Sequence, residues 1–226
     1  NCTMVNITTR TELINYLFEY KLGYKKSYLE IGLSYPEGNY YYVFSANKES
    51  VDPLCDDDIL VCDNNVRKYI IDNVLTYRMT SDDFFAQCNK KYDLIFIDGL
   101  HIADQVRRDI INAYNHLNEG GFIIIHDCLP PFEARQFEDN YEDMVNRGLG
   151  WNGSTWKALP NLDKAGLDFQ VLDIDEGCGI IKYDGPKDFS NYTVTDLSYN
   201  DVFLDTDVRD KIMHVNFPVR TFTGLV

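Results

Sequence analysis

Two short stretches of the sequence end in side chains that can transfer a proton or bind a cation. Asp98 and His101 follow the apolar run Leu94–Ile97, and His126 and Asp127 follow a second apolar run. Unbroken apolar runs of this length are typical of strands that are buried on both faces of a parallel sheet. A histidine with an ordinary pKa of about 6.5 is largely neutral at pH 7 and can accept a proton. We therefore expect a reactive site where these two strands end.

A helical pattern separates the two runs. Residues 102–117 place Val106, Ile110 and Ala113 on one face, with charged residues elsewhere. The order strand, helix, strand forms a unit in which the two strands are parallel. Ligands of open α/β sheets bind at the carboxyl edge of such strands. The sequence therefore predicts that both groups of polar residues face the same ligand-binding edge.

Similar elements recur along the rest of the chain. A helix is expected over residues 9–22, where Thr9 and Glu12 have the spacing of a capping box. Strands that alternate with helices predict an α/β fold with a parallel sheet. The further helices are expected over residues 39–48, 65–72, 102–117, 132–147 and 207–215, with a short one near Thr80; the strands are expected at 27–33, 49–53, 75–79, 94–97 and 122–125, before a hairpin of 169–174 and 179–183.

A glycine turn and a later acidic residue favour a cofactor that contains a nucleoside. Gly32 and Gly38 flank a turn with Pro36, and glycines in such a turn let a ligand approach the backbone closely. Asp52 ends the next expected strand about twenty residues after Gly32, which is the spacing of an acid that binds a ribose hydroxyl in βαβ units. Residues that cap the helix near Thr80 are expected at the same edge, within reach of a nucleobase.

Length and charge limit the possible partners. The chain has 226 residues and 45% hydrophobic content, enough for one sizeable core. Its formal charge of −15 argues against binding of nucleic acid, which requires a basic surface. No apolar run approaches the roughly 20 residues that cross a bilayer, and no signal peptide opens the chain. We expect a cytoplasmic protein without a membrane partner. Because the chain begins at Asn1, we expect either trimmed termini or, as the favoured alternative, a domain cut from a longer polypeptide.

The cysteines do not form a metal-binding or disulfide pattern. The chain has six of them, without a CxxC pair, and it is too large to need disulfide staples. We expect reduced thiols. Four glycosylation sequons occur, but this short pattern matters only in a secreted protein.

Six fragments of the sequence carry a family resemblance: Tyr28–Gly32, Ser50–Pro53, Met79–Phe85, Asp93–His101, His126–Cys128 and Trp151–Lys157. Together they resemble the class I S-adenosylmethionine-dependent methyltransferases, and in particular a branch of small methyltransferases often found beside glycan-building enzymes. The resemblance implies a Rossmann-like, mostly parallel seven-stranded sheet with an antiparallel last strand and helices on both faces. It covers residues 9–185 and implies a single domain, with an N-terminal helix in 1–26, a core in 27–185 and an extension in 186–226.

The resemblance also implies where S-adenosylmethionine binds. The implied residues are Glu30, Gly32 and Gly38 under the methionine part, Asp52 at the ribose, Ser81 and Asp82 beside the adenine, and Asp98 near the methionine amino group or the reacting centre. The sequence departs from the family by placing Ser34, Tyr35 and Pro36 between its glycines. In a dinucleotide-dependent oxidoreductase a pyrophosphate must approach the backbone of this turn closely. The three larger residues between the glycines therefore make that class of enzyme a distant alternative.

The implied reaction is methyl transfer to a sugar hydroxyl of a glycan, with His101 or His126 as the base and Asp98 and Asp127 orienting the acceptor. In metal-dependent relatives such as catechol O-methyltransferase, acids at the positions of Asp98 and Asp127 hold Mg²⁺. The resemblance therefore implies a Mg²⁺ or Mn²⁺ site at these two carboxylates, because hard cations prefer oxygen ligands. Cys128 stands where the relatives have a hard amide ligand, and it weakens that expectation.

Other interpretations stay open at the level of the sequence. The acceptor could instead be a catechol-like small molecule, or the chain could bind the donor without catalysis. The Gly148–Lys157 segment, which holds both tryptophans, could be a lid over the sheet edge or a packed connection. The resemblance also suggests a parent polypeptide with glycosyltransferase domains, of the kind that large algal viruses make, which would place the protein in the host cytoplasm.

Overall fold

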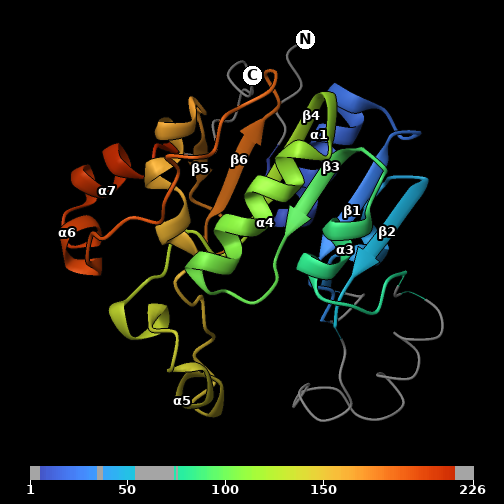
Figure 1. The fold of residues 1–226 in the computed structure, drawn as a ribbon. Helices are drawn as coiled ribbons and strands as arrows, with labels where there is room; N and C mark the ends of the chain where they lie inside the picture. Colours follow the sequence, from blue (N-terminus) through green and yellow to red (C-terminus); the bar gives the residue numbers. More distant parts are fainter. Residues whose placement is uncertain (1–5, 35–37, 54–73, 75, 217–226) are drawn as a thin grey trace.

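The computed structural model describes residues 6–34, 38–53, 74 and 76–216. In this part of the chain the strands form one seven-stranded sheet in the order β2-β1-β3-β4-β6-β5-β7 (Figure 1). Strands β1 to β4 are parallel neighbours, β6 is antiparallel to both β4 and β5, and β7 is parallel to β5. The strands are β1 Ser27–Ile31, β2 Asn47–Val51, β3 Tyr92–Ile97, β4 Leu117–Ile125, β5 Gln170–Leu172, β6 Cys178–Lys182 and β7 Val215–Asn216.

Helices cover both faces of the sheet, with α3 and α4 on one face and α1 on the other (Figure 1). Successive side chains of a strand point to opposite faces, and β3 accordingly places Ile95 and Ile97 in one core and Leu94 and Phe96 in the other. The expected α/β fold with a mostly parallel sheet is thus confirmed. The α-helices are α1 Arg10–Leu17, α3 Ser81–Gln87, α4 Ala103–Asn115, α5 Tyr141–Asn146, α6 Tyr199–Phe203 and α7 Thr206–Ile212; a π-helix at Phe18–Leu22 extends α1, and short 3-10 helices occupy Tyr40–Tyr42, Glu133–Gln136, Thr155–Ala158 and Pro160–Ala165.

The prediction of a helix over residues 39–48 is wrong. Only a single 3-10 turn forms there, and β2 already begins at Asn47. The side chain of Asn15 in α1 donates to the carbonyl of Tyr42 and accepts from the N–H of Phe44, at 2.7 and 2.8 Å. Tertiary hydrogen bonds therefore take the backbone groups that a helix would pair internally.

The helix expected over residues 132–147 is also wrong as one element, because it divides into the 3-10 helix Glu133–Gln136 and α5. The carbonyl of Arg135 accepts from the N–H groups of Asn152 and Gly153, and the carbonyl of Phe137 accepts from the indole of Trp151. A later loop thus captures the carbonyls that a continuous helix would use.

Three smaller predictions need comment. The strand expected at 75–79 reduces to one isolated bridge between Tyr77 and Val51, with residue 75 outside the described residues. The helix expected at 65–72 lies wholly outside them. The helix expected at 207–215 is α7 followed by β7. No helix in the described part of the chain combines the length and apolar character that a bilayer crossing requires.

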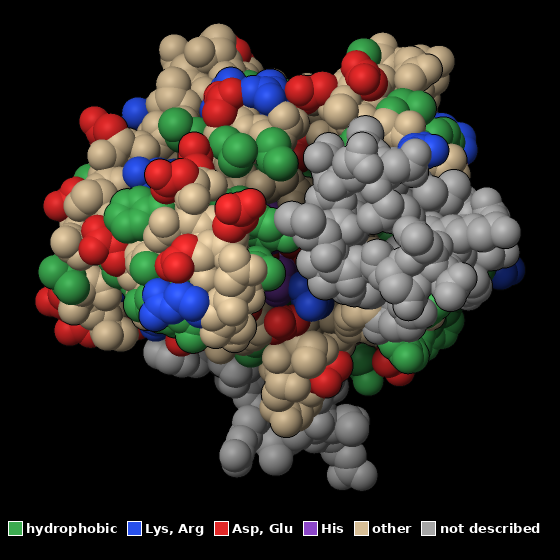
Figure 2. Space-filling model, turned by 90° about the horizontal axis from the view of Figure 1, so that it is seen from below, with side chains coloured by type: hydrophobic (Ala, Val, Ile, Leu, Met, Phe, Trp, Pro, Cys, Tyr) green, Lys and Arg blue, Asp and Glu red, His purple; other side chains and the backbone are tan. Residues whose placement is uncertain are grey.

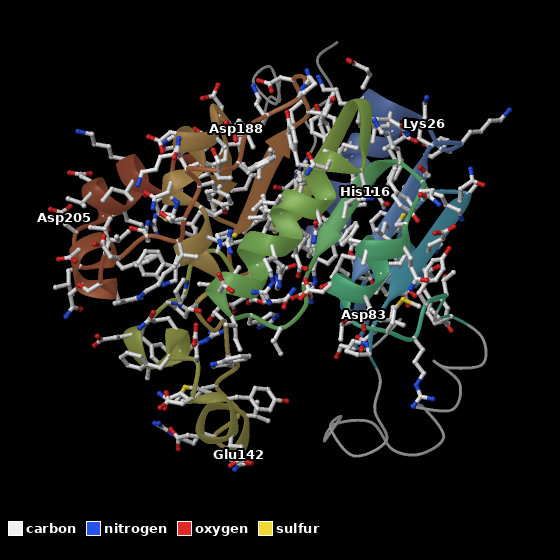
Figure 3. All side chains as sticks on the ribbon, viewed as in Figure 1. Lys26, Asp83, His116, Glu142, Asp188 and Asp205 are labelled. Atoms are coloured by element: carbon white, nitrogen blue, oxygen red, sulfur yellow. The ribbon has the colours of Figure 1, made fainter. Side chains whose placement is uncertain are left out.

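The parallel register brings the ends of β1, β3 and β4 together at one edge. The N–H of Asp98 donates to the carbonyl of Ile31 at 2.9 Å, and the N–H of His126 donates to the carbonyl of Ile97 at 3.1 Å. The turn between β5 and β6 returns to the same edge, since the N–H of Cys128 donates to the carbonyl of Gly177. Asp83 marks this edge, whereas Lys26 and His116 lie at the opposite one (Figure 3).

Gly32 ends β1 in direct contact with the loop after β3. Its φ is +85°, and a Cβ atom added there would lie 2.0 Å from the carbonyl oxygen of Asp98. Only glycine fits both the conformation and the space.

We predict that Gly32→Ala lowers the free energy of unfolding by about 3 kcal/mol or more, from the positive φ together with the overlap. Gly120→Ala is the matched control, because Gly120 has a φ of +75° and nothing within 4 Å of an added Cβ. That control should cost only about 1–2 kcal/mol. Urea unfolding measures both changes, and equal losses would contradict the role of the close approach.

Candidate active site

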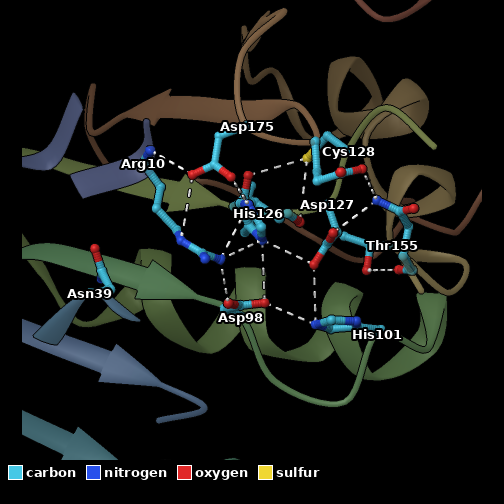
Figure 4. Close-up of polar contacts among 12 residues, drawn as sticks. Arg10, Asn39, Asp98, His101, His126, Asp127, Cys128, Thr155 and Asp175 are labelled. Carbon is cyan, nitrogen blue, oxygen red and sulfur yellow. Dashed lines mark hydrogen bonds and ion pairs between the residues drawn. The ribbon is translucent and has the colours of Figure 1, made fainter. Parts of the chain in front are cut away.

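The four polar residues that end β3 and β4 lie together, as predicted (Figure 4). The Nε2 atom of His101 lies 2.9 Å from Oδ1 of Asp98 and 3.3 Å from Oδ2 of Asp127. The Nδ1 atom of His126 lies 3.0 Å from the same Oδ2 of Asp127. The two strand ends therefore form one connected cluster of carboxylates and imidazoles.

His126 is the buried member of this cluster, with 5% of its side chain exposed. Its Nε2 atom lies 3.4 Å from Oδ1 of Asp175, in the turn between β5 and β6. Burial opposes protonation, but the charges of Asp98, Asp127 and Asp175 outweigh it and raise the pKa of His126 well above the ordinary value. The acids around His126 thus favour its protonated form.

His101 is the more accessible histidine, with 19% of its side chain exposed. Although burial opposes it, the bond to Asp98 and the charge of Asp127 raise the pKa of His101. Its Nδ1 atom is buried and has no hydrogen-bond partner among the described residues. Since Nε2 faces two carboxylates, the neutral ring would carry its proton on Nε2 and keep the lone pair on Nδ1.

Arg10 completes the cluster from the start of α1. Its guanidinium Nη1 lies 3.4 Å from Oδ2 of Asp98 and 3.1 Å from Nδ1 of His126, and its backbone N–H donates to Asp175 at 2.8 Å. Sequence reasoning missed both Arg10 and Asp175. No local pattern could place them, because they join the site from positions 165 residues apart.

The backbone is strained at this cluster. Among the described residues other than glycine, six have a positive φ, and His101, Asp127, Asp175 and Glu176 are four of them, with values of 60, 63, 43 and 67°. Each such residue costs of order 1–3 kcal/mol and persists only where the surrounding structure enforces it. The concentration of strain around the acidic and imidazole groups makes the cluster the candidate functional site.

Cys128 does not contribute its thiol to the cluster. The Sγ atom donates to the carbonyl of Ile125 at 3.3 Å and packs against Gly179 in the core. Burial raises the pKa of the thiol above its ordinary value, so it stays protonated. Among the described residues, Asp98, His101 and Asp127 instead form a group whose possible ligand atoms all lie within 4.8 Å of one another.

The residues predicted to hold the methionine and ribose parts of a donor lie beside the cluster. Asp52 accepts the N–H of Leu33 at 2.8 Å, which fixes the turn after β1. Glu30 is buried at the end of β1, where Oε1 accepts from Tyr28 and Asn39. Nothing lies within 4 Å of an added Cβ at Gly38.

The predicted adenine residues begin α3. Ser81 is buried and donates to Oδ1 of Asp109 at 2.6 Å, while the exposed Asp82 accepts from Gln105 at 3.1 Å. Burial raises the pKa of Asp109 to about 6. Sequence reasoning missed Asp109, which lies one turn after Gln105 on α4 and holds Ser81 in place. The roles of all the donor residues stay predictions.

Viewed from the carboxyl edge, a histidine and basic side chains are visible in a recess of the surface, among acidic and hydrophobic side chains (Figure 2). Within the cluster, the side chains of His101 and Asp98 are 19% and 21% exposed. His116 and His214 lie outside it, since they pack on Phe85 and Phe169, respectively.

Residues 37–128 match the model of a methyltransferase domain family. The matched range includes Asp52, Ser81, Asp98, His101 and Asp127. The prediction of a methyltransferase is confirmed at the level of this domain.

Three solved structures show how similar and how divergent the fold is. A putative caffeoyl-CoA O-methyltransferase from Staphylococcus aureus shares 20% identity over 80% of this chain and 86% of that chain, with a TM-score of 0.48. An O-methyltransferase from Bacillus cereus in complex with SAH shares 13% identity over 80% and 83%, with a TM-score of 0.49. A putative O-methyltransferase from Klebsiella pneumoniae shares 15% identity over 76% and 79%, with a TM-score of 0.48. The search of curated proteins gave no match.

Glu30 provides a test of the electrostatics beside the site. Burial raises the pKa of its carboxyl from 4.5 to about 7, so the folded protein holds a proton that the unfolded chain releases between these pH values. Stability should therefore fall as the pH rises from 4.5 to about 7.

We predict that Glu30→Gln removes this loss, because an amide stays neutral and its oxygen can still accept from Tyr28 and Asn39. Between pH 4 and pH 8 the variant should gain up to about 3 kcal/mol relative to the wild type. Urea unfolding at several pH values measures the gain. The exposed Glu119→Gln is the matched control, and parallel curves for Glu30→Gln and the wild type would contradict the buried proton.

Proposed function

We propose that the chain, which carries a methyltransferase domain, transfers a methyl group from S-adenosylmethionine to a hydroxyl group of a sugar on a glycan. The observation that carries the proposal is the environment of His101. Its Nε2 atom faces Asp98 and Asp127, while its Nδ1 atom lacks a partner among the described residues. An imidazole held by a carboxylate on one nitrogen is a base on the other.

The donor would bind in the turn after β1. The absence of a Cβ at Gly32 is what lets this turn meet the loop of Asp98. Asp52 would hold the ribose hydroxyls, Ser81 and Asp82 would flank the adenine, and Glu30 and Gly38 would shape the floor under the methionine. S-adenosylmethionine supplies an electrophilic methyl group on a sulfonium, and the chain orients it toward the acceptor.

His101 suits the role of base better than His126. A base must come within about 3 Å of the hydroxyl proton, and His126 is enclosed by Arg10, Asp127 and Asp175. In the proposed mechanism the side chains that bury Nδ1 of His101 move aside, the acceptor hydroxyl donates to this atom, and Asp98 and Asp127 stabilise the imidazolium as the proton arrives. An unassisted sugar hydroxyl is a poor nucleophile at neutral pH, so this proton transfer is the main chemical contribution of the chain.

Aromatic side chains beside His101 support a sugar acceptor. The ring of Trp151 stacks on that of His101 with centroids 5.3 Å apart, and Tyr141 meets Trp151 edge-on at 5.2 Å. The carbonyl of Phe137 accepts from the indole of Trp151, and the Phe137 side chain is 42% exposed. The acidic Glu138 follows it in the sequence. Aromatic faces pack against the apolar face of a sugar ring, while carboxylates accept its hydroxyls. The net charge of −15 disfavours a phosphorylated acceptor.

We predict that His101→Gln lowers the turnover number by about 10²- to 10⁴-fold, the usual contribution of a general base. Binding of S-adenosylmethionine should persist in calorimetry. Turnover is measured by mass spectrometry as the gain of one methyl unit on glycans incubated with labelled donor.

His116→Gln is the matched control, since His116 lies at the opposite edge of the sheet (Figure 3). Aromatic diols in the same acceptor panel test the catechol-like alternative. Methylation of diols alone would overturn the sugar acceptor, and donor binding without turnover on any acceptor would favour a non-catalytic module. Failure to bind S-adenosylmethionine would overturn the whole proposal.

Asp98, His101 and Asp127 also have the chemistry to hold Mg²⁺ or Mn²⁺, through two carboxylate oxygens and one imidazole nitrogen. A cation there would lower the pKa of the acceptor hydroxyl. If Nε2 of His101 binds the cation, it cannot donate to Asp98, so the two roles of His101 exclude each other.

We predict that EDTA leaves the turnover number unchanged, because the described residues provide a base without a cation. Dialysis against EDTA, followed by assay with and without added Mn²⁺, checks this expectation. A loss in EDTA that Mn²⁺ restores would reassign Asp98 and Asp127 to a metal site.

A further inference from the structure

The tryptophan-rich segment left open by the sequence is a packed connection in its central part. Residues 152–156 are buried, and Asn152 has no exposed surface. The sequon that begins at Asn152 is therefore inaccessible for glycosylation in the folded protein. A buried, polar segment beside the active site needs an explanation of its own.

Residues 151–154 contact His101 along its backbone and its ring. The N–H of Ser154 donates to the carbonyl of His101 at 2.9 Å, and a Cβ atom at Gly153 would lie 2.0 Å from that oxygen. Trp151 stacks on the ring. Ser154 also accepts the N–H of Ala103 through its hydroxyl at 2.7 Å, which caps the start of α4. These contacts hold His101 at its positive φ.

Asn152 contacts the carboxylate on the other side of the ring. Its Nδ2 atom donates to Oδ1 of Asp127 at 2.8 Å and to Oε2 of Glu176 at 3.2 Å. Arg135 holds Glu176 at 2.9 Å, and the carbonyl of Arg135 accepts the N–H of Asn152. Because Oδ1 of Asp127 is taken by Asn152, its Oδ2 is left for the two histidines.

Packing alone does not account for Asn152. Its side-chain oxygen is buried without a hydrogen-bond partner among the described residues. An unsatisfied buried oxygen costs about 1–3 kcal/mol, and an apolar side chain of similar size would avoid that cost. The contribution of the amide is therefore the hydrogen bond that its Nδ2 atom donates to Asp127.

We propose that Asn152 is a positioning residue that acts through Asp127: it turns Oδ2 of Asp127 toward Nε2 of His101 and so fixes the tautomer with the lone pair on Nδ1. This inference rests on the proposed role of His101 as the base. Removal of the hydrogen-bond partner that orients a metal-binding side chain commonly lowers activity about 10- to 100-fold. We expect an effect of the same size when the partner that orients Asp127 is removed.

The test is nitrogen NMR of the protein labelled with ¹⁵N-histidine, at one fixed pH and without any ligand. The chain has four histidines, and the signals of His101 are assigned with His101→Gln. Asn152→Ala should shift the ring signals of His101 and His126, and leave those of His116 and His214 in place. Unfolding would move all four, so the outer pair controls for structure.

Asn161→Ala is the matched control, because Asn161 donates its amide to the carbonyl of Thr193, remote from the cluster. If Asn152→Ala does not fold, Asn152→Leu, which is close in size, removes the same donor without opening a cavity. Unchanged His101 signals in a folded Asn152 variant would overturn the inference.

Kinetics separate this inference from the proposed function. With methyl glycosides of common hexoses as acceptors, Asn152→Ala should lower the turnover number about 10- to 100-fold at an unchanged KM for the donor. The loss should disappear in an Asp127→Ala background, where Asn152 has nothing to orient. Additive losses would overturn the inference, whereas full turnover by His101→Gln would overturn the proposed function instead.

Discussion

The structure depends on placing several carboxylates at one edge of a parallel sheet without leaving their charges unpaired. Asp98, Asp127 and Asp175 come from three different loops and share two imidazoles and the guanidinium of Arg10. Burial opposes ionisation of Asp98, but the charges of His126 and His101 outweigh it and hold its pKa well below the ordinary value. Asp98 therefore stays charged and favours the protonated form of both histidines, so a proton that His101 accepts is stabilised there.

The backbone around the cluster is arranged to keep these charges at fixed distances. The β-sheet register brings the ends of β1, β3 and β4 together, and the turn between β5 and β6 adds Asp175 from the antiparallel side. Positive φ angles at four of the polar residues turn their side chains out of the strand direction, toward one another. The strained backbone is held in place because glycines elsewhere in the fold pack directly against the loops that carry the charged groups.

This arrangement divides the carboxyl edge into two regions with different chemistry. The side of Gly32, Asp52 and Ser81 has backbone turns and short polar side chains that suit a nucleoside-containing donor. The other side has His101 under an aromatic ring, with acidic residues nearby, which suits a neutral hydroxylated acceptor. Asp98 lies between the two regions, so in the proposed reaction its carboxylate would be close to both the donor and the acceptor.

The sequence by itself determined the features that depend on neighbours along the chain. The apolar runs predicted buried strands, the caps at Thr9 and Thr80 predicted helix starts, and strand-end position predicted that Asp98, His101, His126 and Asp127 would meet. It failed for residues 39–48 and 132–147, where Asn15 and the 151–153 loop capture backbone groups from a distance. Only the tertiary structure decided that Arg10, Asp175 and Asn152 join the site. It also decided that the thiol of Cys128 turns into the core. The side chain of His101 is more exposed than that of His126 for the same reason. Local sequence encodes hydrogen bonds and periodicity within an element, whereas contacts between loops far apart in the chain exist only once the sheet has assembled.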